Sequence, residues 1–64
     1  MKYAGLTNDP QRVKKEYNNP SDFKVRHFGS EFEARRWQKH MLAQGYEGET
    51  GGAEWRYGYT FSVT

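Results

Sequence analysis

The sequence contains no cysteine, only two prolines and no long run of apolar residues. Without cysteine, neither a disulfide nor a thiolate metal site is available to stabilise the chain. No segment approaches the roughly 18 apolar residues that span a bilayer, and the N-terminal residues lack the apolar stretch of a signal peptide. We therefore expect one cytoplasmic domain over residues 1–64, with no membrane as a partner.

Aromatic residues are abundant for so short a chain. Two Trp, five Tyr and four Phe make up 17% of the 64 residues. A domain of this size hides only about 60% of the surface that its unfolded chain exposes, so large rings are needed to build the core. Self-association is the other common remedy for a small core, and a homodimer or a protein partner is one hypothesis for this chain.

Charge is distributed unevenly along the chain. Residues 1–40 hold nine of the ten basic and five of the eight acidic residues, a net charge of +4, whereas residues 41–64 carry a net charge of −2. The first two-thirds of the chain could therefore face an anionic partner. The alternative is an ordinary solvated surface with mixed charges.

The first half of the sequence predicts a strand, a short helix and a second strand. Residues 2–6 and 23–28 alternate in the manner of strands. Between them, Asn8 or Asp9 can cap a helix, and Pro10 suits its first position, where a missing N–H costs nothing.

The second half predicts a longer helix and a strand. Ser30 and Glu33 form a capping box, and Gly45 follows the expected helix over residues 30–44. Residues 54–63 place five aromatic or apolar side chains on one face at period two. The expected fold is a small α+β (α/β) domain in the order β-α-β-α-β, with a three-stranded antiparallel or mixed sheet and both helices packed on one face.

Six basic residues fall on the two predicted helices. If the helices pack side by side, their outer faces form one basic surface that binds phosphates without regard to sequence. Tyr3, Tyr57 and Tyr59 could then stack bases, or else belong to the core. His27 and His40 are expected at or near the surface, with His40 one helical turn from Arg36. The six basic residues are Arg12, Lys14, Lys15, Arg35, Arg36 and Lys39.

The segment Tyr-Ala-Gly-Leu-Thr-Asn-Asp-Pro-Gln-Arg, residues 3–12, resembles the second motif of the GIY-YIG nuclease superfamily. There a Tyr-x-Gly strand end runs through a Thr and an Asn/Asp turn into a helix that carries an Arg. The strand over 23–28 and the Ser-Glu-Phe-Glu-Ala helix start also resemble the later part of that domain. The resemblance covers residues 3–44.

The resemblance implies family roles for individual residues. Tyr3 and Arg12 match the Tyr and Arg that position the scissile phosphate, and Tyr17 falls where a His or Tyr is usual. Gln38 stands where the family has its metal-binding Glu, so no metal site is expected, and Mg²⁺ or Mn²⁺ would be needed only by an active nuclease. The family's Gly-Ile-Tyr strand does not precede Tyr3. In a permuted arrangement, the strand over 54–63 would take its place beside the first strand, with Tyr57 or Tyr59 supplying the missing Tyr.

These observations favour a non-catalytic GIY-YIG-like domain that binds DNA or RNA. The expected contacts are Tyr3 and the six basic helix residues. Two alternatives remain open: a protein-interaction or homo-oligomeric module, and a metal-dependent endonuclease.

Overall fold

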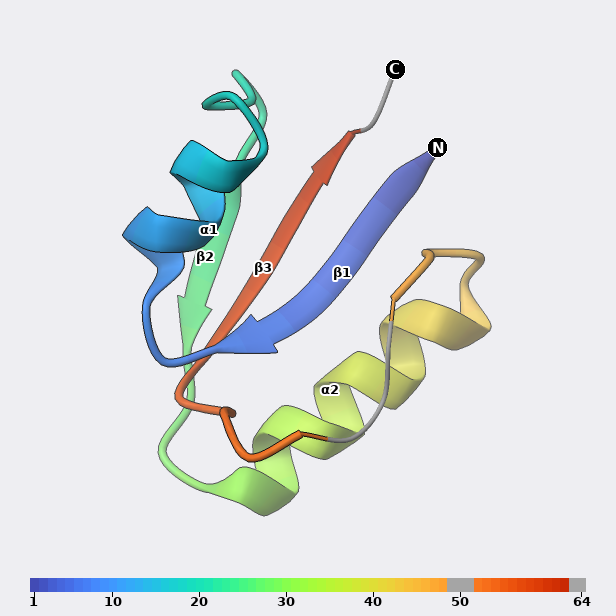
Figure 1. The fold of residues 1–64 in the computed structure, drawn as a ribbon. Coiled ribbons are helices and arrows are strands. Elements are labelled where there is room, and N and C mark those ends of the chain that lie inside the picture. The colour runs from blue at the N-terminus through green and yellow to red at the C-terminus, as the bar shows by residue number, and fades with distance from the viewer. Residues whose placement is uncertain (49–51, 63–64) are drawn as a thin grey trace.

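The computed structural model describes residues 1–48 and 52–62. Its elements are, in chain order, β1 (Lys2–Thr7), α1 (Pro10–Glu16), β2 (Lys24–His27), α2 (Glu31–Ala43) and β3 (Tyr57–Ser62) (Figure 1). The predicted α+β class and β-α-β-α-β order are confirmed. The last strand is shorter than the predicted 54–63, and Val63 lies outside the described residues.

Both helices begin at the predicted caps. The Asp9 side chain accepts a hydrogen bond from the Arg12 N–H at 3.2 Å, directly before Pro10. The Ser30 hydroxyl accepts from the Glu33 N–H at 3.3 Å. These bonds satisfy N–H groups that have no partner within the helix. Gly45, just beyond α2, has a φ of +99°, which a glycine adopts without strain.

The sheet is antiparallel throughout, with β3 in the centre. Its strand order is β1-β3-β2, so the last strand of the chain separates the first two. The alternating rings of β3 explain this position, because only a central strand buries aromatic side chains against neighbours on both sides. In the register, Tyr59 lies opposite Gly5 of β1 and Val25 of β2.

The two helices cover opposite faces of the sheet, and not one face as expected. The Tyr17 ring, just after α1, lies 4.6 Å from that of Phe61, measured between ring centroids. Trp37 of α2 instead packs on Gly58. Neighbouring residues of a strand point to opposite faces, so these contacts place α1 and α2 on either side of β3 (Figure 1).

The physical reason lies in the small residues of β3. The side of β3 that carries Gly58 and Thr60 has the small and polar residues that are typical of a strand face exposed to water. In the structure, Gly58 gives the Trp37 ring room to approach the strand. The small residues of β3 therefore make room for α2, and this face of the strand is covered by a helix and not by water.

The two edges of the sheet differ. The outer edge of β1 is covered, because the Ala4 N–H donates to the Glu47 carbonyl and the Glu47 N–H donates to the Lys2 carbonyl, both at 2.8 Å. The outer edge of β2 has no partner strand among the residues that the structure describes. The Phe28 N–H donates to the Arg56 carbonyl at 2.9 Å, and hydrogen-bonded pairs recur at every second residue of an antiparallel ladder. The N–H and carbonyl of Val25 therefore point outward, away from β3.

Candidate nucleic-acid interface

The predicted basic residues are divided between the two faces of the domain. Arg12, Lys14 and Lys15 belong to α1, while Arg35, Arg36 and Lys39 belong to α2. Since the helices lie on opposite faces of the sheet, they do not form the shared basic surface that side-by-side packing would give.

On the α1 side, carboxylates neutralise Arg12. Its guanidinium lies 3.6 Å from Glu54 and 3.8 Å from Glu16. These three residues, together with Thr7 and Tyr59, are among those that line a pocket of about 260 Å³. Two carboxylates beside one guanidinium leave this pocket with no excess of positive charge, which does not suit a phosphate.

Glu54 has a structural role in this pocket. Its carboxylate accepts hydrogen bonds from the Asn8 N–H at 2.8 Å and the Thr7 hydroxyl at 3.2 Å. These bonds, the Asn8 N–H first, and the charge of Arg12 lower the pKa of Glu54 below its ordinary value of 4.5. Glu54 thus ties the segment before β3 to the end of β1.

Tyr3 and Tyr17 belong to an aromatic cluster between α1 and the sheet. The Tyr3 ring lies 5.6 Å from Phe61 and 6.1 Å from Tyr17, and Tyr59 and Phe23 extend the cluster. Tyr3 is half-buried, whereas Tyr17 is 43% exposed. Tyr3 is therefore part of the packing of this face rather than an open platform for a base.

Gln38, at the position of the family's metal-binding Glu, is only 2% exposed. It lies in the buried part of α2 with Ala34. Among residues 1–48 and 52–62, no three His, Asp or Glu side chains lie close enough together to hold a metal ion.

Arg35 also lies away from the open surface of α2. It is half-buried, lies 3.2 Å from Glu31 within the helix, and donates to the carbonyl of Gly52. The spacing of four residues places Glu31 and Arg35 on one face of α2. Arg36 and Lys39, in contrast, are exposed.

A groove between β2 and α2, here called the β2–α2 groove, was not predicted from the sequence. It has a volume of about 360 Å³. Arg26 reaches it because the even-numbered residues of β2 share the face of Gly58, on which α2 lies. Helical spacing brings four residues of α2 to the same place. The groove is lined by Arg26, Phe28, Glu33, Arg36, Trp37 and His40.

The groove combines positive charge with aromatic surface. Arg26 and Arg36 are two permanent cations, and Glu33 is the one acid among its lining residues. The Arg26 guanidinium lies 5.4 Å from the centroid of the Phe28 ring. Neither Arg26 nor Arg36 makes an ion pair with any carboxylate that the structure describes. Both guanidiniums are therefore available to an anionic ligand.

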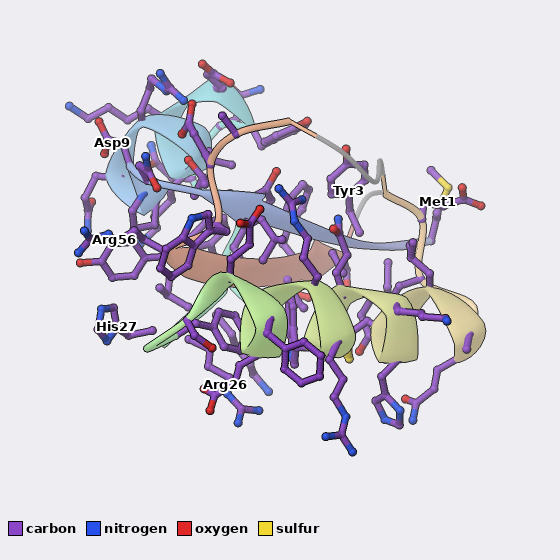
Figure 2. The ribbon with its side chains drawn as sticks, turned by 90° about the horizontal axis from the view of Figure 1, so that it is seen from below. Met1, Tyr3, Asp9, Arg26, His27 and Arg56 are labelled. Atoms are coloured by element: carbon purple, nitrogen blue, oxygen red, sulfur yellow. The ribbon has the colours of Figure 1, made fainter. Side chains whose placement is uncertain are left out.

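Two further polar side chains lie near Arg26 at the end of β2. Figure 2 shows Arg26, His27 and Arg56 at the same end of the molecule. Two of them lie against rings, because the Arg56 guanidinium is 5.7 Å from the Trp55 ring and the His27 ring is 5.1 Å from that of Tyr57. Neither His27 nor Arg56 lines the groove, and His27 and Tyr57, next to Arg26 and Gly58 in their strands, point to the opposite face of the sheet.

One signal in the sequence pointed toward this groove. His40 lies one helical turn from Arg36, so a basic face of that helix was expected. Its partner Arg26 was missed because it comes from another element, and only the pairing of β2 with β3 brings it near α2. Trp37 is half-buried and lines the groove as well.

None of the helices described in residues 1–48 and 52–62 has the length and apolar character needed to cross a membrane. Compared with known proteins, the chain matches no family model, no curated protein and no solved structure.

Proposed function

We propose that this chain is a non-catalytic, GIY-YIG-like domain that binds nucleic acid through the β2–α2 groove. The observation that carries the proposal is the pair of guanidiniums at Arg26 and Arg36, which make no ion pair with a described carboxylate and lie beside half-buried Trp37. Arginines supply the sequence-independent affinity for phosphates, and Lys39 on the same helix adds to the positive charge.

The strand pairing supports the GIY-YIG-like part of the proposal. The permuted arrangement requires the C-terminal strand to lie beside the Tyr-Ala-Gly strand, and β3 pairs with β1 along its whole length. The Tyr59 ring packs on Gly5, its partner in the register, so closely that a Cβ there would clash with it. Tyr59 thus lies beside the strand of the resembling motif, as a substitute for the family's missing Tyr would.

Two placements argue for binding without cleavage. Arg12, which matches the family's phosphate-positioning Arg, is held by Glu16 and Glu54. Gln38, at the position of the metal-binding Glu, faces the interior. A polyanion in the β2–α2 groove would lie on the opposite face of the sheet from Arg12.

The test is a comparison of two double variants by fluorescence anisotropy with a labelled oligonucleotide. Arg26→Gln with Arg36→Gln removes the two groove cations, while Lys14→Gln with Lys15→Gln removes the same charge from α1. We expect the groove variant to bind at least tenfold more weakly at low salt and to lower the salt slope by about two, since each phosphate contact contributes about one. Equal losses in both variants, or no binding by the unmodified chain at low salt, would overturn the proposal.

The open edge of β2 favours protein pairing as a second candidate function. Val25 is 47% exposed, and its backbone N–H and carbonyl point away from β3. A second copy of β2 would bring Lys24 and Arg26 close to the same two cations of the other copy, so like charges oppose a homodimer formed at this edge. Sedimentation over a wide concentration range tests it: a constant monomer mass rules out self-association.

A further inference from the structure

We infer that the β2–α2 groove takes an unpaired nucleobase on Trp37, so that the ligand of this domain is single-stranded nucleic acid. This inference rests on the proposed function and adds to it the class of nucleic acid. It depends on Trp37, Phe28 and Arg26. None of these three belongs to the six basic helix residues that the sequence predicted as nucleic-acid contacts.

The Trp37 ring is held by its packing on Gly58 and Phe28. The edge of the ring that carries Cζ3 packs on Gly58. A Cβ added at Gly58 would lie only 2.6 Å from Trp37 Cζ3. The Phe28 ring lies 5.4 Å away at an angle of 52° and is itself only 4% exposed. Trp37 remains half-buried and lines the groove. A ring held in this way offers a fixed surface for stacking, and little side-chain freedom is lost when a base binds.

The groove that Trp37 lines also carries a cation on each of its two walls. Arg26 belongs to β2 and Arg36 to α2, so the two walls of the groove each carry one guanidinium. His40 lies on the α2 wall one turn further along the helix. A strand whose base stacks on Trp37 has a phosphate on each side of that nucleotide. A groove that combines one indole with a cation on each wall therefore suits a single strand that crosses it.

The size of the groove argues against a duplex. A volume of about 360 Å³ is near the lower end of the roughly 300–1,000 Å³ that is typical of small-molecule pockets. This accommodates one base and its sugar. In a duplex both faces of each base are covered by its neighbours, so only an unpaired base can lay its face on Trp37.

The test uses changes in the ligand, because truncation of Trp37 would disturb its packing on Gly58. Trp55→Phe leaves Trp37 as the only indole of the chain, and Trp37→Phe leaves Trp55. Each variant is titrated with a thymidine oligonucleotide, with an abasic strand of the same number of phosphates, and with a duplex of equal length. The readouts are indole emission and affinity.

We expect the thymidine strand to quench the emission of Trp37 and to bind roughly 5- to 150-fold more tightly than the abasic strand, the range of one stacked base. Quenching of Trp55 alone, or equal salt-dependent affinity for all three ligands without quenching of Trp37, would overturn the stacking inference and leave phosphate binding intact. Failure of every ligand to bind at low salt would overturn the proposed function as well.

Discussion

The indole of Trp37 packs directly against Gly58, so that a Cβ at position 58 would come within 2.6 Å of the Trp37 ring and 2.7 Å of the Phe28 ring. This contact joins α2 to the central strand and holds the Trp37 ring, which lines the β2–α2 groove. Packing and the proposed binding surface therefore depend on the same glycine.

Gly58→Ala is expected to destabilise the domain by about 1–3 kcal/mol, the usual cost of an overpacked core. The midpoint of urea unfolding, followed by circular dichroism, measures the effect. Gly29→Ala is the matched control, because nothing lies within 4 Å of a Cβ at Gly29 and its φ is not positive. Equal midpoints for the two variants would show that α2 does not dock on Gly58 in this way.

The sequence predicted those parts of the fold that depend on local chemistry. Ser30 caps α2, Asp9 caps α1 and Gly45 follows α2. These helix ends could be predicted because each depends on only a few neighbouring residues. The faces of the sheet were harder to predict. Gly58 and Thr60 have the same character whether water or a helix covers them, so the pattern of β3 alone did not place α2.

The candidate site was predicted in part for a related reason. Arg36 and Lys39 were selected because a charged helix face is visible at a spacing of three and four residues. Arg26 and Trp37 meet only after β2 pairs with a strand some thirty residues later in the chain, a contact that no local pattern encodes. Opposite-face packing then separated Arg12 from the groove.

The cap of α2 provides the second prediction. Ser30→Ala removes the acceptor of the Glu33 N–H and is expected to cost about 1 kcal/mol of folding free energy. Thermal unfolding by circular dichroism measures this. Ser21→Ala, an exposed turn residue, serves as the control and is expected to shift stability by less than about 0.5 kcal/mol. A loss no greater than that of the control would contradict the capping role.

Stability at low pH is expected to depend on Asp22 and Glu54. Hydrogen bonds from Ser62 lower the pKa of Asp22, and the Asn8 N–H lowers the pKa of Glu54. A carboxylate with a lowered folded pKa stabilises the fold fully above its unfolded pKa, and this stabilisation is lost as pH falls through the folded pKa. Stability should therefore begin to fall below pH 4.5, the ordinary value for Glu54.

Urea unfolding measured from pH 7 to pH 2 tests this expectation. Glu54→Gln keeps an acceptor for Asn8 but removes the titrating charge, so the decline at low pH should become shallower. Glu16→Gln is the matched control, since Glu16 also lies near Arg12, at 3.8 Å, but on the same helix. If the pH profile of Glu54→Gln is unchanged, the hydrogen bonds of the Glu54 carboxylate do not contribute to the loss of stability at low pH.

Glu33 is the one acid among the lining residues of the β2–α2 groove, so its charge should oppose a bound phosphate. Glu33→Gln is expected to tighten binding of a thymidine oligonucleotide roughly two- to fivefold at low salt, since an exposed charge interaction contributes about 0.5–1 kcal/mol. Fluorescence anisotropy measures it, and the gain should shrink at high salt, where exposed charges are screened.

Glu31→Gln changes net charge by the same amount in the same first turn of α2, which makes it the control. Glu31 pairs with Arg35 at 3.2 Å, and neither residue lines the groove. If the two variants tighten binding equally, the ligand responds to net charge alone and is not located in the groove. A clearly larger gain for Glu33→Gln than for Glu31→Gln would place the phosphates beside Arg26 and Arg36, because Glu33 lines the groove and a Coulomb interaction weakens with distance.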